Sequence, residues 1–353
     1  MAKNREKFFI NLGKRYEIKS KKNNIIYKLL YLLHSSKIKN FISQSDIMQF
    51  GFNKCLISNQ QDYYNPADFN KFGSYLAGLY EGDGHIWIPS GNSVKKHNPR
   101  FCITFHKDDL PLAEIILKKI GSGFIRMKGR ENAVVLTVSP IKGLTYILSQ
   151  ISNYLRTPKI HQVNKLIIWL NLHNKTNYSL LTKNEDSLNK DYWLTGFIDA
   201  DGSFMINYKK KTEKNVNRDI IKLTLTIEQR MFDPISKEKY ESILSKIASF
   251  FNTNLRVRTQ KSTGNCYYRI VATSYLSIVA VIDYLTRYPL QSSKRLNYLN
   301  FKKASLIKMS NKNKILSIEQ KNIIFDLKEN MNRKRTFYSW NHLNNSELFK
   351  TLN

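Results

Sequence analysis

The alternation of hydrophobic and polar positions predicts the same series of elements twice along this chain of 353 residues. The first series opens with a short helix in GSYLAGLYEGDG, followed by the strands HIWIP and RFCITFH with a polar loop between them. The period then becomes helical in DLPLAEIILKKIG and returns to strict alternation in GFIRMKGRENAVVLTVS, a hairpin that turns at GREN. Helices around 141–154 and 159–172 close the series.

The second series repeats this order with different residues. The helix DYWLTGFIDADG leads into the strands SFMINYKKK and RDIIKLTLTIEQ, then into the helix PISKEKYESILSKIASFF and a hairpin, NLRVRTQKSTGNCYYRIVATS, that turns at STGN. Helices around 275–287 and 294–306 follow. The sequence therefore predicts an α+β protein built from two αββαββα repeats.

Composition divides the chain into five parts. The parts are a basic extension at 1–70 with a possible helix at 24–34, a first repeat at 71–172, a polar linker at 173–190, a second repeat at 191–310, and a tail at 311–353 with one helix in SIEQKNIIFDLKENMN.

The opening helices of the two repeats carry similar nine-residue phrases, LAGLYEGDG and LTGFIDADG. Gly78 and Gly82 lie four residues apart on one helical face, and Gly196 and Ala200 do the same in the second phrase. Small side chains at this spacing let another helix approach closely. Such a contact would offset the roughly 1 kcal/mol by which glycine weakens a helix interior. The small residues alone are explained by core packing, without any function.

The acids near the end of each phrase call for a further explanation. Asp83 and Asp201 fall in the last helical turn, where the partial negative charge of the helix disfavours an aspartate by about 0.3–1 kcal/mol. We expect the glycines that follow, Gly84 and Gly202, to end the helices with positive φ. One such acid would be typical of a surface turn. Two such acids in matching contexts converge if the helices pack together. Because the two carboxylates would repel each other, this arrangement favours a divalent cation with oxygen ligands, Mg²⁺ above all.

The net charge of the chain indicates the kind of molecule that it binds. Lys and Arg number 57 against 27 Asp and Glu, a formal charge of +30, which attracts polyanions. An anionic membrane surface is the alternative to nucleic acid, but it usually comes with one strongly amphipathic basic helix, and here the basic residues are mixed with Tyr, Asn and Thr in strand-like stretches. No apolar run reaches the roughly 18 residues of a membrane span. The three cysteines have no paired spacing, which excludes a cysteine-based zinc site and a disulfide framework and fits a reducing compartment. The abundance of Asn, Lys, Ile, Tyr and Phe is typical of AT-rich genomes, as in organelles, where a protein needs no import signal.

The two phrases resemble the signature of the LAGLIDADG homing endonucleases, in their single-chain form with two repeats. LTGFIDADG differs from the consensus at two positions and LAGLYEGDG at three, and stretches such as NPRFCITFHKDDLPLAE resemble members encoded in fungal mitochondrial introns. The resemblance covers about 71–310. It implies a monomer in which the phrase helices form the interface between repeats and two four-stranded sheets form a saddle in the major groove of double-stranded DNA. It also implies mitochondrial localisation.

The resemblance also implies roles for individual residues. Asp83 and Asp201 would bind the metals, with the backbone carbonyls of Gly82 and Ala200 facing them. The sixth letters of the phrases, Glu81 and Asp199, would be structural. A catalytic lysine would stand at the start of each repeat's last helix, and a polar residue at the end of each second strand would orient water. The candidates for these catalytic positions are Lys159 and Lys294 for the lysines, and Gln229 with His106 as its counterpart for the polar residue.

The strands supply side chains suited to reading base edges in the major groove. They stand at alternating positions, as on the solvent face of any amphipathic sheet. The candidates are Arg100, Arg126 and Lys128 in the first repeat, and Lys209, Lys222, Arg256, Arg258, Gln260 and Arg269 in the second. Because the repeats differ at nearly every strand position, we expect a long non-palindromic target.

Two other functions remain open from the sequence. An intron RNA maturase could use the same scaffold to assist splicing, with or without nuclease activity, and a DNA-binding regulator would need no catalysis. A maturase that had lost cleavage would be expected to lose one or both acids, and both are present. The hypothesis of a DNA-binding regulator without catalysis accounts least well for the paired acids. We therefore expect a site-specific, Mg²⁺-dependent double-strand DNA endonuclease.

Overall fold

The computed structural model describes residues 70–93, 96–129, 131–211, 219–311 and 315–350. The predicted extension at 1–70, apart from its last residue, and the helix at 24–34 lie outside these residues. In the described part, the chain forms two four-stranded antiparallel sheets, each within one αββαββα series, so the predicted α+β class and repeat architecture are confirmed.

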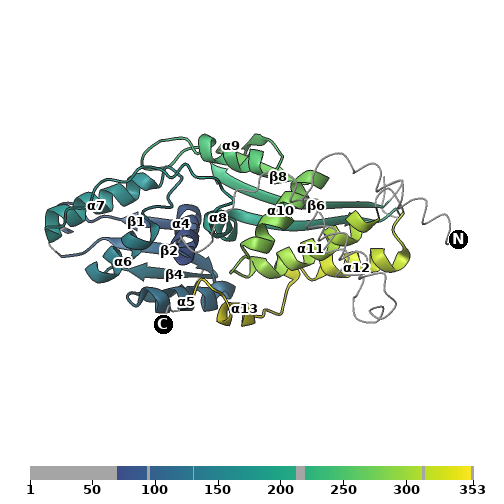
Figure 1. The fold of residues 1–353 in the computed structure, drawn as a ribbon, viewed down its shortest axis with the longest axis horizontal. Coiled ribbons are helices and arrows are strands. Elements are labelled where there is room, and N and C mark those ends of the chain that lie inside the picture. Colours follow the sequence, from purple (N-terminus) through teal and green to yellow (C-terminus); the bar gives the residue numbers. More distant parts are fainter. Residues whose placement is uncertain (1–69, 94–95, 130, 212–218, 312–314, 351–353) are drawn as a thin grey trace, which may run out of the picture. The chain divides into compact units, whose positions relative to one another are not determined.

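The first repeat arranges its strands in the order β1-β2-β4-β3 (Figure 1). Gly84 pairs with Ile103 across β1 and β2, and Ile103 pairs in turn with Leu136 across β2 and β4. In the hairpin of β3 and β4, Lys128 pairs with Ala133, on either side of the predicted turn. The elements are α4 (Lys71–Asp83), β1 (Gly84–Trp87), η2 (Gly91–Ser93), β2 (Arg100–His106), η3 (Lys107–Asp109), α5 (Leu110–Ile120), β3 (Phe124–Lys128), β4 (Ala133–Val138), α6 (Ile141–Ile151) and α7 (Ile160–Asn174).

The second repeat has the equivalent order, β5-β6-β8-β7. Gly202 pairs with Ile227, and Ile227 pairs with Ile270, so each strand has the register of its counterpart in the first repeat. The elements are α8 (Trp193–Asp201), β5 (Gly202–Lys209), β6 (Ile220–Arg230), α9 (Glu241–Phe250), β7 (Leu255–Thr259), β8 (Cys266–Ala272), α10 (Tyr275–Arg287) and α11 (Lys294–Ser310).

One predicted helix is shorter than its sequence pattern suggests. The stretch from Pro234 was expected to be helical to Phe251, but α9 begins only at Glu241. The Asp233 carboxylate accepts hydrogen bonds from the backbone N–H groups of Ile235 and Ser236, which stabilises a turn there instead. A side-chain oxygen that satisfies these backbone donors competes with helix formation.

The helices α4 and α8 pack side by side between the two repeats, as predicted (Figure 1). A Cβ atom on Gly78 would lie 1.9 Å from the carbonyl oxygen of Trp193, and one on Gly196 would lie 2.1 Å from the carbonyl oxygen of Tyr75. A Cβ on Gly82 would collide with Ala200. The small residues therefore bring the two backbones into direct contact, which is the reason for their spacing.

The expected positive φ at the helix ends is wrong. Gly84 has φ −92° and Gly202 has φ −81°, both extended, because each helix runs directly into a strand. Glycine is still required there for a steric reason. A Cβ on Gly84 would lie 2.7 Å from the Tyr80 carbonyl oxygen, and one on Gly202 would lie 2.6 Å from the Ile198 carbonyl oxygen.

Alternate strand residues divide each sheet into an inner and an outer face. Phe101, Ile103 and Phe105 of β2 are buried, as are Leu223 and Leu225 of β6. Helices α5, α9, α10 and α11 pack on the sheets and bury these side chains. The intervening residues share the opposite face, which we call the outer face of each sheet.

The C-terminal tail joins both repeats. Its helix α12 (Ile318–Glu329) confirms the predicted helix and packs on α11 and β5, and η4 (Asn332–Lys334) and α13 (Asn341–Asn344) follow. The chain then reaches the first repeat, where Glu347 forms an ion pair with Lys71 and Phe349 packs edge-on against Phe72 and Tyr75. The hydrophobic pattern gave no indication of this crossing.

Candidate active site

Two carboxylates stand at the adjoining ends of α4 and α8. Asp201 is partly buried, and burial followed by the charge of Asp83 raises its pKa to about 7. Asp83 faces solvent on one side, yet the protein atoms around its carboxyl group raise its pKa as well, against the attraction of Lys294 and Lys159. The packing thus places together two acids that disfavour each other's charge, as predicted from the two phrases.

Each repeat also directs one lysine to the end of its phrase helix. The Lys159 ammonium donates to the carbonyl oxygens of Gly82 at 2.6 Å and Gly84 at 2.8 Å. Lys294 donates to the carbonyl oxygen of Ala200. Lys159 is the N-cap of α7 and Lys294 is the first residue of α11, so both stand where the sequence predicted. Burial lowers the pKa of Lys159, and the charges of Asp201 and Asp83 oppose this change.

The acids at the sixth position of the two phrases, Glu81 and Asp199, accept hydrogen bonds from the turns that precede these lysines. Glu81 accepts hydrogen bonds from the backbone N–H and hydroxyl of Thr157, both at 2.6 Å. Asp199 accepts from the Gln291 N–H at 2.8 Å and the Ser292 hydroxyl at 2.5 Å. Burial raises the pKa of both acids, and these donors oppose the increase. The geometry matches the structural role implied for them.

The strand register separates the two residues expected to orient water. The Gln229 amide donates to the Asp201 carboxylate at 2.8 Å, which places it at the site. Because Gly84 pairs with Ile103 as Gly202 pairs with Ile227, the counterpart of Gln229 is the buried Phe105. The correspondence predicted for His106 is therefore wrong by one residue. Its imidazole instead lies beside Asp108, at 3.2 Å from the carboxylate.

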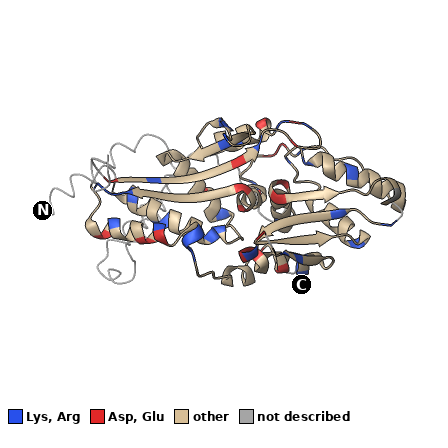
Figure 2. Cartoon of the chain, turned by 180° about the vertical axis from the view of Figure 1, so that it is seen from behind, with Lys and Arg blue, Asp and Glu red and all other residues tan. Residues whose placement is uncertain are grey.

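The basic residues predicted to meet DNA share the outer face of their sheets. In the first sheet, Arg126 and Val135 are register partners, as are Lys128 and Ala133, and both pairs lie opposite the buried positions. In the second, Arg256 pairs with Arg269. Figure 2 shows Lys and Arg along the strands of both sheets, with acidic residues on the central helices. The predicted residues on these faces are Arg100, Arg126, Lys128, Lys209, Lys222, Arg256, Arg258 and Arg269, and Gln260 follows β7 with the same alternation.

The outer faces contain further residues that the sequence reasoning missed. Glu228 lies among the basic residues, 2.5 Å from Arg258 and 3.4 Å from Arg269, and so fixes both guanidinium groups. Arg230 is exposed two positions beyond it. In the first sheet the Arg100 guanidinium lies over the Trp87 ring, 5.1 Å from its centroid. Extending the alternation along each strand would have found Arg230 and Trp87, but the pairing of Glu228 depends on the register.

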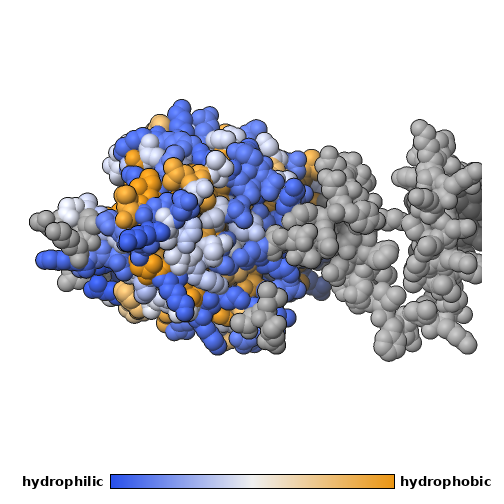
Figure 3. All heavy atoms as spheres, turned by 60° about the vertical axis from the view of Figure 1, so that its left-hand side comes forward, coloured by the Kyte–Doolittle hydropathy of each residue, from blue (hydrophilic) through white to orange (hydrophobic). Residues whose placement is uncertain are grey.

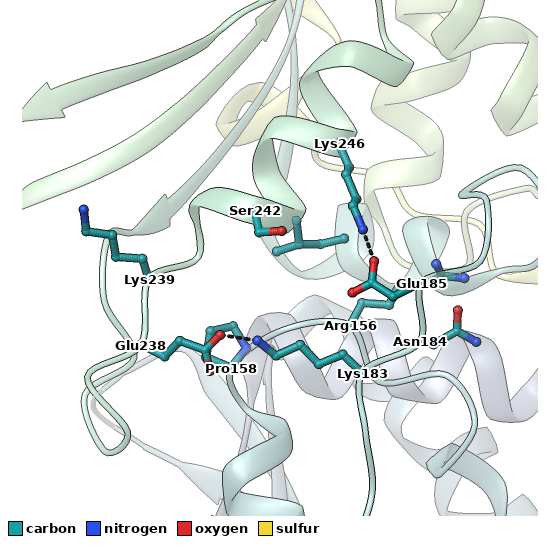
Figure 4. Close-up of a pocket in the computed structure, with 10 residues that line it drawn as sticks. Arg156, Pro158, Lys183, Asn184, Glu185, Glu238, Lys239, Ser242 and Lys246 are labelled. Atoms are coloured by element: carbon teal, nitrogen blue, oxygen red, sulfur yellow. Dashed lines mark hydrogen bonds and ion pairs between the residues drawn. The ribbon is translucent and has the colours of Figure 1, made fainter.

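A pocket of about 160 Å³ is lined by residues of the linker, of the turn that precedes α7, and of α9, and neither Asp83 nor Asp201 lines it. Its charged side chains pair with each other, as Figure 4 shows for Lys183 with Glu238 and Lys246 with Glu185. His161, at the start of α7, also contacts Glu238, at 2.7 Å. These pairs fasten the linker to the second repeat and leave no convergent set of unpaired charges.

The face shown in Figure 3 is mainly hydrophilic, with hydrophobic patches between the polar side chains. The exposed apolar residues of the chain include Ile168 and Leu172, which lie four residues apart on one face of α7. Among the residues that the structure describes, no helix is long and apolar enough to cross a membrane.

Two repeats that meet on a pair of acid-ended helices, with a four-stranded sheet on each, define the fold of the LAGLIDADG endonucleases. The family model described as LAGLIDADG endonuclease matches residues 76–170 and 194–305, and the chain belongs to this family. The boundaries of both matches fall on the phrases and on the last helix of each repeat.

Relatives of known sequence extend the likeness beyond the repeats. The chain is 27% identical over 350 residues to the intron-encoded DNA endonuclease aI3 of Saccharomyces cerevisiae, covering 92% of this chain and 84% of the relative. It is 35% identical over 252 residues to a 37.2 kDa cox1 intron-2 protein of Schizosaccharomyces pombe, covering 71% of this chain and 70% of the relative.

Solved structures support the fold. The homing endonuclease I-SmaMI bound to cleaved DNA superposes with a TM-score of 0.55 at 22% identity, covering 77% of this chain and 98% of that one. A second structure of I-SmaMI, bound to its uncleaved target in the presence of calcium ions, gives 0.53 at 21% identity and covers 76% and 99%.

Proposed function

We propose that this chain is a homing endonuclease that cuts both strands of a long, non-palindromic DNA site. The observation that carries the proposal is the convergence of one acid and one lysine from each repeat: Asp83 and Asp201 end two helices in direct contact, and the charges of Lys159 and Lys294 act on both acids. Each repeat thus contributes one set of groups, as the cutting of two strands requires. Names of relatives such as the aI3 endonuclease support the same activity.

The donor set suits a hard divalent cation, for which we propose Mg²⁺. Asp83 and Asp201 would hold it through their carboxylates, because their mutual repulsion is relieved by a positive charge between them. The carbonyl oxygens of Gly82 and Ala200 already accept from the lysines, but a carbonyl has two acceptor positions and can also face the cation. When bound, the cation supplies Lewis-acid stabilisation of phosphate charge. The calcium-containing structure of I-SmaMI supports a divalent ion in this family.

The remaining groups have distinct tasks in phosphodiester hydrolysis. Water attacks phosphorus, the bond to the leaving oxygen breaks, and that oxygen takes up a proton. The ammonium groups of Lys159 and Lys294 can stabilise the charge that develops on the phosphate. The amide of Gln229, held 2.8 Å from Asp201, can orient water at the second repeat. The first repeat has Phe105 in the equivalent place and lacks this amide, so the two half-sites are chemically unequal.

The two outer faces supply target recognition. Basic side chains on antiparallel strands reach base edges and phosphates of the major groove. The nine predicted residues differ in type and position between the sheets, which supports two different half-sites in the target. Because both repeats belong to one chain, we propose a monomer. The cox1 intron origin of one relative, and an amino-acid composition typical of AT-rich genes, support a mitochondrial location.

Cleavage of the uninterrupted exon junction of the host gene tests this proposal. A plasmid carrying that junction is incubated with the parent chain, Asp83→Asn, Asp201→Asn and the control Asp283→Asn, each with Mg²⁺ and with EDTA. Asp283 is a matched surface acid on α10, paired with Arg287. We expect double-strand cleavage by the parent and the control with Mg²⁺ only, and a loss of at least about a hundredfold in the two site variants.

Two results would contradict the proposal. Full activity in both site variants would remove Asp83 and Asp201 from the reaction. Binding of the host intron RNA, without cleavage of the junction DNA under any condition, would support the RNA maturase function instead.

A further inference from the structure

Two aromatic side chains make reciprocal hydrogen bonds across the interface between the repeats. The Tyr75 hydroxyl, on α4, donates to the Asp199 carboxylate at 2.9 Å. The Trp193 indole N–H, on α8, donates to the Glu81 carboxylate at 2.6 Å. Tyr75 and Trp193 both stand directly before the nine-residue phrase of their own helix and are fully buried. The same two bonds therefore run in opposite directions through the pseudo-symmetric interface.

Each acid that receives such a bond also holds the lysine-bearing turn of its own repeat. Glu81 accepts from the Thr157 hydroxyl, and that hydroxyl oxygen accepts from the Lys159 N–H at 3.2 Å. Asp199 accepts from the Ser292 hydroxyl, which accepts from the Lys294 N–H at 3.2 Å. We call each series from aromatic to acid, to hydroxyl, to lysine a relay. The two relays have the same chemical order with different residues.

Both relays end at the reaction site. The Lys159 ammonium reaches the Gly82 carbonyl and that of Lys294 reaches the Ala200 carbonyl, each next to the acid of its own repeat. A buried carboxylate that loses one donor redistributes its remaining hydrogen bonds. Removal of the aromatic donor in one repeat is thus transmitted to the lysine of the other repeat.

We propose that Tyr75 and Trp193 are positioning residues that act in trans: Trp193 of the second repeat positions Lys159, and Tyr75 of the first repeat positions Lys294. The inference rests on the proposed nuclease function, since it assigns the two lysines to the cutting of DNA. Its consequence is that neither half-site is fully formed unless the other repeat is docked. A chain with an imperfect interface then cuts poorly on both strands rather than well on one.

Strand-resolved cleavage tests this proposal. The exon-junction DNA carries a different label on each strand, and single-turnover rates are measured for each cut with Mg²⁺. Lys159→Met and Lys294→Met first identify the strand that depends on each lysine. Tyr75→Phe removes only the hydroxyl donor, and Trp193→Phe removes the indole N–H donor together with part of the buried ring. Tyr298→Phe is the matched control, because its buried hydroxyl contacts the Ile282 carbonyl and neither acid.

We expect opposite strand preferences from the two variants. Trp193→Phe should slow the Lys159-dependent strand by about tenfold, and Tyr75→Phe should slow the Lys294-dependent strand by a similar factor, with DNA affinity unchanged in both. The control should change neither rate. Equal slowing of both strands, or slowing of the strand that depends on the lysine of the same repeat as the variant, would overturn the proposal.

Crystal structures of the same variants give a second measurement that does not require activity. In Trp193→Phe the Lys159 ammonium should leave the Gly82 carbonyl while Lys294 keeps its contact with Ala200, and Tyr75→Phe should show the reverse. Unchanged lysines in both variants would overturn the proposal. A parent chain that cuts no DNA would count against the proposed function, and these structures would still decide the positioning.

Discussion

The fold holds the Asp201 carboxyl group where its ionisation is disfavoured. Its pKa of about 7, far above the usual range of an aspartate, reflects burial and the neighbouring Asp83 carboxylate. The unfolded chain ionises this group near pH 4, whereas the folded chain does so near pH 7. Without a cation, the folded state therefore loses stability relative to the unfolded state as the pH rises through this window, and the whole cost is present above pH 7.

Asp201→Asn should accordingly stabilise the cation-free protein. At pH 8 with EDTA we expect a gain on the order of 1–3 kcal/mol in the free energy of unfolding, and at pH 4 almost none. Asparagine keeps an oxygen that can accept the Gln229 amide bond. Thermal unfolding followed by circular dichroism at both pH values measures the difference. The control Asp326→Asn, on the exposed side of α12, should change the melting temperature little at either pH. A loss of stability in Asp201→Asn at pH 8 would show that the carboxylate stabilises the fold.

At the scale of elements, the contact between α4 and α8 determines the site. The backbone contact at Gly78 and Gly196 brings the helix ends together, and the acids follow from it. The strands matter in a different way, because their register decides which side chain lies next to each acid. That register assigns Gln229 to the second site and Phe105, not His106, to the equivalent place in the first.

The helix contact predicts a large effect from a single methyl group. Gly78→Ala should destabilise the protein by about 1–3 kcal/mol, because the new Cβ would overlap the Trp193 carbonyl and force the helices apart. Chemical denaturation measures the loss. Gly129→Ala is the matched control, since a Cβ there has open space, and its effect should stay within about 0.5 kcal/mol. Equal effects of the two substitutions would argue against direct backbone contact at Gly78.

At the scale of the whole molecule, the C-terminal tail ties the repeats together. It leaves α11 and β5 of the second repeat, and Glu347 and Phe349 near its last described residue contact α4 of the first, with Leu343 and Leu348 buried along the way. The His342 ring nitrogen and the Gln291 carbonyl lie 2.9 Å apart, next to the turn that carries Lys294. The tail therefore supports the interface between the two repeats.

Loss of one buried side chain in the tail should weaken this support. Leu348→Ala should cost about 2–4 kcal/mol of unfolding free energy, as expected for a fully buried leucine. Leu276→Ala on α10, where the leucine is 64% exposed, is the control and should cost less than about 0.5 kcal/mol. Denaturant titration of both variants provides the comparison. Similar costs for the two would mean that the end of the tail does not stay docked in solution.

The charge of the whole chain predicts how binding responds to salt. Each phosphate that the outer faces neutralise should add about 0.9 to the slope of log affinity against log salt. Arg256→Ala should weaken binding to the exon-junction DNA by about tenfold, measured by fluorescence anisotropy in Ca²⁺. Lys118→Ala, on α5 and away from the outer face, should leave the affinity nearly unchanged. A stronger effect from Lys118 would place the DNA on the helical side of the sheets.

The sequence by itself determined the repeated αββαββα order, the helix contact and the paired acids, because these follow from local periodicity and from a phrase written twice. It also placed Lys159 and Lys294, which follow short turns in both copies. Only the tertiary structure decided what depends on register and on contacts distant in sequence. The register of β2 made Phe105, and not His106, the counterpart of Gln229. The packing of α4 on α8 brought Tyr75 to Asp199 and Trp193 to Glu81. The crossing of the tail between the repeats also depended on tertiary contacts. Periodicity assigns a residue to a face, but its neighbour there is fixed only when separate segments pack.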